Sequence, residues 1–175
     1  AKNGSDIELV TASDSSLQQF KLSSVSTTVA NGVYYIRIAG ASNTVLDVYG
    51  GSYSSGANVQ VYTKNGTGAQ KWEIKRNSDG TYTILNAQSG LALDVKNGSA
   101  QAGANVQQYT PNGSNAQKWH ITYENGGYKI TSALSSSLVL ETAGGSTSSG
   151  ANVQVGGYSA AAGQQFTFLA TSYTP

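Results

Sequence analysis

The sequence predicts an all-β protein built from three copies of one unit, and three observations support this prediction. A seventeen-residue phrase occurs twice almost unchanged, as "GANVQVYTKNGTGAQKW" at 56–72 and "GANVQQYTPNGSNAQKW" at 103–119, with a diverged copy at 150–166. Short alternations of apolar and polar residues fill each unit and end in glycine-rich turns. Equivalent residues also return at two equal steps of 47 residues: Gly56, Gly103 and Gly150; Leu46, Leu93 and Leu140; Gln70, Gln117 and Gln164.

The composition fits such a chain and excludes several classes of function. Of 175 residues, 21 are glycine and only 11% are charged, against about 25% in average soluble domains. A formal net charge of +1 gives no basic footprint for nucleic acid, and no apolar run approaches the ~20 residues of a membrane span. Because the chain contains no cysteine, disulfides, thiol catalysis and cysteine-based metal sites are excluded.

Each unit is predicted to contain four short strands. In the middle unit these are expected at 81–85, 91–95, 105–109 and 118–122, where alternation marks one buried face. The stretches "SDG", "NAQSG", "KNGS" and "PNGSN" supply the intervening turns.

Three four-stranded units could be propeller blades or solenoid turns, but the repeat number argues against both. Propellers usually need four to eight blades, and solenoids need polar caps. Closure into one threefold body with a shared core removes the sheet edges, which predicts a β-trefoil. The units are expected at about 32–78, 79–125 and 126–170, and residues 171–175 form a tail.

A partial fourth copy precedes these units. Residues 4–22 align without a gap on 56–74, so residues 1–22 are interpreted as the closing half-unit of a preceding trefoil. Residues 23–31 would then be a linker, and the natural protein would carry trefoils in tandem. The alternative is an N-terminal arm that only resembles the repeat.

The repeats also carry a recognisable signature. "QKW" at 70–72 and 117–119 and "QQF" at 164–166, with "LDV" at 46–48 and 93–95, resemble the ricin-type Q-x-W β-trefoil lectins, also called family 13 carbohydrate-binding modules. This resemblance covers roughly residues 31–170 and implies a β-trefoil fold and glycan binding. It also implies a site on each unit, made by an aspartate, two glutamines and an aromatic residue. The first unit offers Asp47, Gln60, Tyr62 and Gln70, and the second offers Asp94, Gln107, Tyr109 and Gln117.

These residue types suit sugar recognition. A carboxylate and an amide make paired hydrogen bonds to adjacent hydroxyls, and an aromatic face covers the C–H face of a pyranose. The chain departs from the family at the position before the Q-x-W glutamine, which is often asparagine and is alanine here (Ala69, Ala116). Asn115 could compensate in the second unit, and Tyr49 and Tyr53 could line the first site.

The diverged copies separate framework from site. The glutamine persists in the third unit as Gln164, although glutamate replaces the aspartate (Glu141) and glycine replaces the tyrosine (Gly156). The Q-x-W glutamines are therefore interpreted mainly as structural, and Trp72, Trp119 and Phe166 as core anchors. The third site is expected to be empty, unless Tyr158 substitutes in part. The aspartates could instead only cap turns, and the tyrosines could be ordinary strand aromatics.

The predicted function is therefore a non-catalytic carbohydrate-binding module of a larger secreted or cell-surface protein. The only histidine, His120, follows a core tryptophan on a strand and should point outward, and no catalytic triad or metal-ligand cluster is evident. Glycans are the expected partners, with no cofactor or metal, and the missing remainder could be a glycoside hydrolase. Two alternatives stay open: a structural spacer with decayed sites, and a protein-binding trefoil in a surface adhesin.

Overall fold

The computed structural model describes residues 28–41 and 43–171, which form twelve β-strands and no α-helix. Short 3-10 helices join several strands, and none of them has the length or hydropathy of a membrane-spanning helix. The strands are β1 (Gly32–Ile38), β2 (Thr44–Val48), β3 (Val59–Thr63), β4 (Trp72–Arg76), β5 (Tyr82–Asn86), β6 (Ala92–Val95), β7 (Val106–Tyr109), β8 (Trp119–Glu124), β9 (Gly127–Ser132), β10 (Leu138–Thr142), β11 (Val153–Gly157) and β12 (Phe166–Ala170). The 3-10 helices are η2 (Tyr49–Gly51), η3 (Gly68–Gln70), η4 (Lys96–Gly98), η5 (Asn115–Gln117), η6 (Ala143–Gly145) and η7 (Ala162–Gln164).

Six of the strands close into a barrel. Each pairs antiparallel with the next in the cycle β1–β4–β5–β8–β9–β12, and β12 pairs back to β1. The first and last strand of each unit therefore both belong to the barrel. Closure leaves no unpaired edge in this ring, which removes a site for edge-to-edge aggregation.

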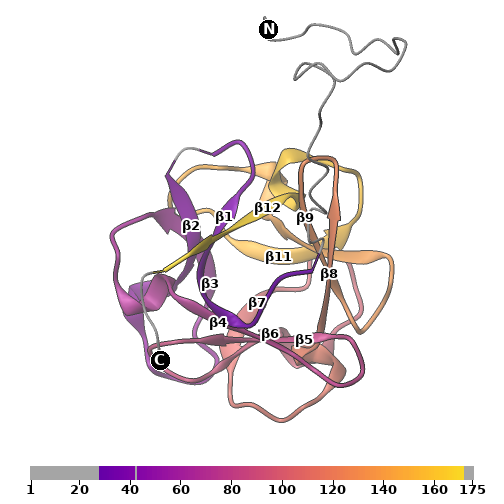
Figure 1. The fold of residues 1–175 in the computed structure, drawn as a ribbon, viewed down its shortest axis with the longest axis horizontal. Helices are drawn as coiled ribbons and strands as arrows, with labels where there is room; N and C mark the ends of the chain where they lie inside the picture. The colour runs from indigo at the N-terminus through magenta and orange to yellow at the C-terminus, as the bar shows by residue number, and fades with distance from the viewer. Residues whose placement is uncertain (1–27, 42, 172–175) are drawn as a thin grey trace, which may run out of the picture.

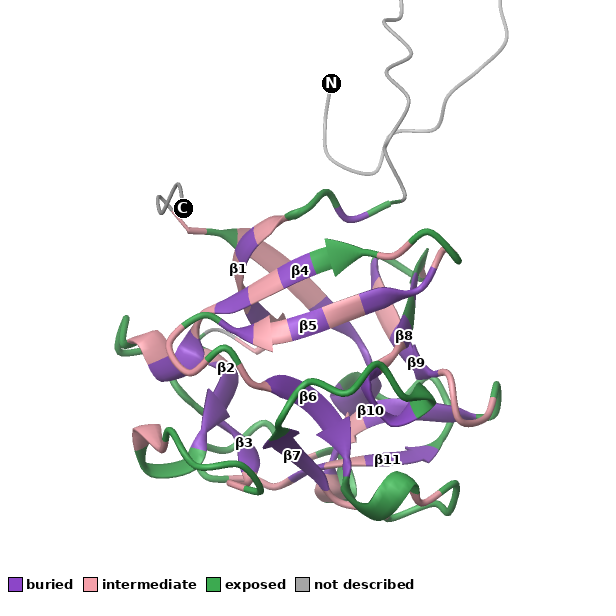
Figure 2. Cartoon of the chain, turned by 90° about the horizontal axis from the view of Figure 1, so that it is seen from below, coloured by how far each residue is buried: buried purple, intermediate pink, exposed green. Residues whose placement is uncertain are grey.

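The other six strands form three hairpins, one from each unit, at one end of the barrel. These are β2–β3, β6–β7 and β10–β11, which lie below the barrel strands in Figure 2. In Figure 1 the three units follow one another around the middle of the molecule, with β3, β7 and β11 near the centre. The fold is thus a β-trefoil with pseudo-threefold symmetry, as the sequence predicts.

The core is built from equivalent residues of the three units. Trp72, Trp119 and Phe166 are fully buried at the start of β4, β8 and β12, where the sequence analysis places core anchors. Each tryptophan indole Nε1 donates a hydrogen bond of 3.1 Å to a leucine carbonyl of its own unit, Leu46 or Leu93. The buried indole N–H groups are thereby satisfied, as buried polar groups require.

The "GAN" that opens each repeated phrase joins neighbouring units. Gly56, Gly103 and Gly150 have φ values of 87°, 85° and 89°, a left-handed backbone that favours glycine. Each of these glycines donates its N–H to a strand of the next unit along the chain, or of the first unit in the case of Gly150, at 2.7 Å. Each pair of units is therefore joined by one of these backbone hydrogen bonds.

Two residues further along the chain, the asparagine side chains form a closed ring. Asn58 Nδ2 donates to Asn152 Oδ1, Asn105 Nδ2 to Asn58 Oδ1, and Asn152 Nδ2 to Asn105 Oδ1, each at 2.9 Å. Each unit therefore supplies one donor and one acceptor. We call these three residues the asparagine ring.

The strands predicted for the middle unit are confirmed as β5 to β8, with ends displaced by one or two residues. Of the predicted domains, residues 1–22, linker residues 23–27 and tail residues 172–175 lie outside the described residues. Residues 28–31, placed in the linker by the sequence, lie against the barrel. There Val29 is buried in the core, and Asn31 Oδ1 accepts a hydrogen bond of 2.8 Å from the Arg76 backbone N–H. The assignment of domains stays a prediction.

Candidate functional site

The β2–β3 hairpin brings three of the predicted site residues of the first unit onto one face. Strand alternation buries Val59 and Val61 completely and turns Gln60 and Tyr62 to the opposite face. Asp47 lies directly across from Gln60 in the strand register, and Gln60 Nε2 donates to Asp47 Oδ2 at 2.9 Å. Carboxylate and amide are therefore held as one unit beside an aromatic ring that stays 43% exposed.

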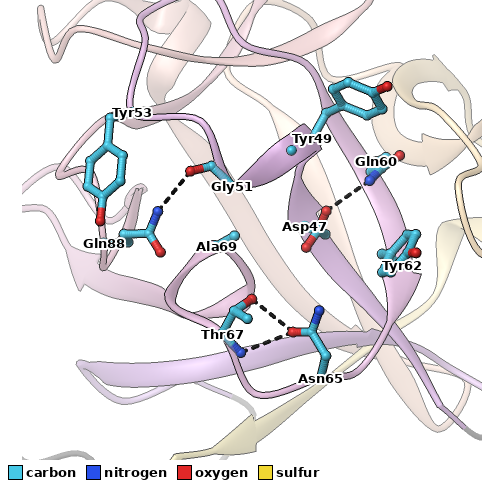
Figure 3. Close-up of a pocket in the computed structure, with 11 residues that line it drawn as sticks. Asp47, Tyr49, Gly51, Tyr53, Gln60, Tyr62, Asn65, Thr67, Ala69 and Gln88 are labelled. Atoms are coloured by element: carbon cyan, nitrogen blue, oxygen red, sulfur yellow. Dashed lines mark hydrogen bonds between the residues drawn. The ribbon is translucent and has the colours of Figure 1, made fainter.

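These residues line a pocket of about 640 Å³. Its far wall comes from the loop after β3, where Asn65 Oδ1 accepts hydrogen bonds from Thr67 N–H (3.0 Å) and Thr67 Oγ1 (2.8 Å). Ala69, in the η3 turn that follows this loop, and Tyr49, in the η2 turn, also line the pocket. Figure 3 shows the Asp47 carboxylate between Gln60 and Tyr62 on one side of the pocket and Tyr53 and Gln88 on the other. The expectation that Tyr49 and Tyr53 line this pocket is confirmed.

The second unit repeats the arrangement in a smaller pocket of about 230 Å³. Asp94 lies across from Gln107 in the β6–β7 register, and Gln107 Nε2 donates to Asp94 Oδ1 at 2.9 Å. Tyr109, 42% exposed, stands two residues beyond Gln107 on the same strand. The η4 turn beside this pocket has Asn97 at φ 60°, a conformation that asparagine tolerates better than most residues.

The Q-x-W glutamines lie behind the pockets and do not line them. Gln70 is fully buried, with Oε1 accepting from Asn65 N–H at 2.8 Å and Nε2 donating to Thr63 O at 3.0 Å. Gln117 closes the equivalent loop and in addition donates to Asp94 Oδ2 at 3.1 Å. Each glutamine thus fixes the loop that follows the third strand and supports the aspartate from behind.

Sequence reasoning missed several residues that line the pockets. Asn65 and Asn112 occupy equivalent positions in the first and second pocket, whereas the proposed substitute Asn115 is exposed and lies outside the second pocket. The signal was present in the sequence, since "NGT" and "NGS" recur at the same step. Gln88 was not predictable in this way, because it enters the first pocket from the loop between β5 and β6 of the second unit.

Burial shapes the electrostatics of both sites. Desolvation raises the pKa of Asp47 above the usual range of an aspartate, and hydrogen bonds from the Gln60 and Gln70 amides partly offset this rise. The pKa of Asp94 is raised for the same reason and is lowered in part by Gln107 and Gln117. Among the described residues neither carboxylate has a cationic partner within salt-bridge distance. Each is a buried acceptor supported only by neutral amides.

The third unit lacks this arrangement. Its Glu141 occupies the aspartate position and accepts hydrogen bonds from Gln154 (2.9 Å) and Gln164 (2.7 Å). Gly156 occupies the tyrosine position, and a Cβ atom there would overlap the Glu141 carboxylate. The longer acid therefore fills the space above the glycine.

Tyr158 points away from the diverged site. Its hydroxyl donates a hydrogen bond to Glu124, and the Lys129 ammonium lies 4.4 Å from its ring centroid. Both partners belong to the β8–β9 hairpin. Tyr158 therefore does not supply the missing aromatic face of the third unit.

The arrangement suits binding better than catalysis. Each of the two sites offers an acceptor, an amide and an exposed aromatic ring, which together match a neutral polyhydroxylated ring. Within residues 28–41 and 43–171 no group of three or more histidine or acidic side chains could hold a metal ion. His120 is exposed, as expected, and lines neither pocket.

The sequence matches the family described as "Ricin-type beta-trefoil lectin domain-like" over residues 16–109, 69–156 and 115–174. No curated protein matches the sequence.

Several solved structures share the fold. A designed threefold symmetric protein, ThreeFoil, is 36% identical with a TM-score of 0.76, over 81% of this chain and 100% of that one. An exo-beta-1,3-galactanase from Clostridium thermocellum is 31% identical with a TM-score of 0.75, over 80% of this chain and 30% of that one. A Polyporus squamosus lectin bound to Neu5Aca2-6Galb1-4GlcNAc is 25% identical with a TM-score of 0.68, over 81% of this chain and 49% of that one.

Proposed function

The chain belongs to the ricin-type β-trefoil lectin domain family, and on this premise we propose that it is a non-catalytic carbohydrate-binding module with two shallow glycan sites. One site is made by Asp47, Gln60 and Tyr62 and the other by Asp94, Gln107 and Tyr109. The observation that carries the proposal is the repeated pairing of a buried carboxylate with an exposed aromatic ring on one hairpin face. Family membership alone does not require this pairing, since the third unit lacks it.

Each residue has a distinct part in the proposed sites. The carboxylate accepts hydrogen bonds from two adjacent sugar hydroxyls, and such charge-assisted bonds are about twice as strong as neutral ones. The glutamine orients the carboxylate and offers its own carbonyl oxygen as a further acceptor. The tyrosine ring covers a C–H face of the pyranose, which supplies burial and sets the orientation of the sugar. Gln70 and Gln117 act as positioning residues behind the aspartates.

Galactose-containing glycans are the proposed ligand class. A galactose unit occurs in the glycan bound to the Polyporus squamosus lectin, and the Clostridium thermocellum enzyme acts as a galactanase. The chemistry also fits, because the axial hydroxyl of galactose leaves one ring face with contiguous C–H groups for a tyrosine to cover. Two weak sites on one chain would gain retention on a polymeric glycan through avidity.

We further propose that the module is part of a larger secreted or surface-borne protein. The chain spans 30% of the galactanase and 49% of the fungal lectin that it resembles, so such modules occur beside other domains. A surface rich in small polar residues with few charges is compatible with an extracellular setting. Any catalytic activity would then belong to a neighbouring domain.

Glycan-array binding of the wild type beside Asp47→Ala/Asp94→Ala tests the two sites. Binding by the wild type and its loss in the double variant are expected, and Tyr62→Ala/Tyr109→Ala should give the same loss with less effect on folding. Glu141→Ala changes the equivalent position of the third unit and is the matched control, expected to bind as the wild type does. Absence of wild-type binding would favour a structural spacer, and binding that survives the double variants would overturn the assignment of the sites.

A further inference from the structure

We infer that the first site binds two or more consecutive sugar units of an oligosaccharide, whereas the second site binds a single sugar ring. This inference rests on the proposed function and assigns Tyr53 and Gln88 as the residues that determine the difference. The first pocket, at about 640 Å³, is nearly three times the size of the second, at about 230 Å³. If one ring fills the second pocket, the first has room for another.

The additional space in the first pocket has its own aromatic residue. Figure 3 shows Tyr53 and Gln88 on the side of the pocket opposite Gln60 and Tyr62, with Asp47 between them. Tyr53 is 69% exposed, more than any other large hydrophobic side chain in the described residues. A ring left so open beside a pocket offers a second stacking face, separated from that of Tyr62 by the carboxylate.

Gln88 is held in place although it belongs to another unit. Its Nε2 donates to Gly51 O at 3.0 Å, and its backbone N–H donates to Asn86 Oδ1 at 3.2 Å. With the amide nitrogen tied to Gly51, the side-chain oxygen remains as an acceptor on the pocket wall. The fixed amide limits the rotamer entropy that a ligand would have to remove.

A glycine makes this placement possible. A Cβ atom at Gly68 would lie 2.6 Å from Gln88 Oε1, so a larger residue at position 68 would displace the glutamine. In the second site the corresponding positions differ, because Asn115 replaces the glycine and Leu134 replaces the glutamine. Gln88 and Leu134 each follow an alanine whose N–H donates to a lysine carbonyl (Ala87 to Lys71, Ala133 to Lys118), and Leu134 is apolar and packed against the core. The first site therefore receives a long polar side chain from the neighbouring unit, and the second does not.

The second pocket also lacks the additional aromatic residues. The positions 47 residues after Tyr49 and Tyr53 are Lys96 and Ala100, and neither lines the second pocket. What the two pockets share is one carboxylate, one amide, one tyrosine and the loop after the third strand. The shared set would hold one ring in each, and the Tyr53–Gln88 wall would contact the next ring in the first pocket only.

Isothermal titration with galactose, β-1,3-galactobiose and β-1,3-galactotriose tests the inference on variants that keep one site each. Tyr109→Ala leaves the first site, and its affinity should rise about tenfold from galactose to galactotriose, the gain expected from one more stacked ring and hydrogen bond. Tyr62→Ala leaves the second site, and its affinity should change less than about threefold over the same series.

Second substitutions in the Tyr109→Ala background identify the residues responsible. Tyr53→Ala and Gln88→Ala should each remove most of the gain with chain length, so that the ratio of galactotriose to galactose affinity falls toward one. Tyr53→Phe keeps the stacking face and should keep the gain. Ser135→Ala changes a polar residue of the corresponding loop between β9 and β10, lines neither pocket, and is the control for Gln88→Ala. Thermal melting of each variant separates a loss of binding from a loss of folding.

The outcomes distinguish the inference from the proposed function. No heat from the wild type with any of the three probes would overturn the proposed galactoside binding and the inference with it. Binding by the wild type with equal affinities for galactose and galactotriose in Tyr109→Ala would overturn the inference alone. The inference would likewise fail, with galactoside binding intact, if Tyr53→Ala and Gln88→Ala kept the full gain.

Discussion

Asn105 belongs to the asparagine ring, and its replacement by alanine should destabilise the protein by an amount that the ring geometry sets. The substitution removes two ring hydrogen bonds, from Asn105 to Asn58 and from Asn152 to Asn105, both 2.9 Å long. It also removes a bond of 3.2 Å from Asn105 Nδ2 to the Val106 carbonyl, and it leaves the ring bond from Asn58 to Asn152. At about 1 kcal/mol for each neutral hydrogen bond, the free energy of unfolding should fall by about 3 kcal/mol.

The decisive quantity is the comparison with the triple variant. Each single substitution breaks two ring bonds, and Asn105→Ala also breaks the bond to Val106, so the three single variants together should lose about 7 kcal/mol. The triple variant Asn58→Ala/Asn105→Ala/Asn152→Ala breaks the three ring bonds and the Val106 bond once each and leaves no ring atom unpaired, so it should lose about 4 kcal/mol. The shortfall of about 3 kcal/mol is the signature of a closed ring, because independent contacts would add.

Urea denaturation followed by tryptophan fluorescence measures these free energies, since both tryptophans are fully buried. Gln101→Ala, an exposed position near the ring residue Asn105 in the sequence, is the control and should change the free energy by less than about 0.5 kcal/mol. If the triple variant lost the sum of the three single losses to within about 0.5 kcal/mol, the cooperative ring would be refuted.

Three further predictions follow from the sites and the repeat. Affinity for galactose should fall as the pH drops through the raised pKa of Asp47 and Asp94, because a protonated carboxyl is a weaker hydrogen-bond acceptor. The free energy of unfolding should change in the opposite direction and rise over the same pH range, because the native state binds these two protons more tightly than the unfolded chain does. Titration calorimetry and urea denaturation at several pH values check both signs, and a pH-independent affinity would contradict the first. Gly156→Tyr should cost about 1–3 kcal/mol of stability through overlap with the Glu141 carboxylate, and Glu141→Asp/Gly156→Tyr should recover most of it in thermal melts. A chain that begins at Thr27 should fold with an unchanged denaturation midpoint; failure to fold would show that residues 1–26 belong to the intact domain.

The periodicity of the sequence was sufficient to predict the β-trefoil, because a register kept over two steps of 47 residues leaves few ways to close three units. The resemblance to the Q-x-W lectins indicated Asp47, Gln60 and Tyr62 as site residues, and strand alternation explains why they share one face in the structure. The persistence of the Q-x-W glutamine in a unit without an aromatic partner indicated a structural part for it. In the structure the Gln70 amide bonds to its own loop.

Contacts between units were less accessible from the sequence. Gln88 reaches the first pocket because the barrel places the β5–β6 loop of the second unit against the first unit. The spacing of the repeats along the sequence does not indicate which residues of different units lie close together in space. The asparagine ring was visible only as a repeated letter in "GANV", since its hydrogen bonds need all three units at once. Long-range closure is a property of the assembled fold and not of any single unit.

In the diverged third unit, positions 141 and 156 are coupled. Glu141 extends over position 156, and a Cβ atom there would overlap its carboxylate, so a tyrosine at 156 requires the glutamate side chain to move. That movement would take the carboxylate away from the Gln154 and Gln164 amides, which now donate to it. An aromatic ring and a glutamate at these two positions therefore compete for one space. Restoring a third site would need a shorter acid at 141 together with the ring at 156.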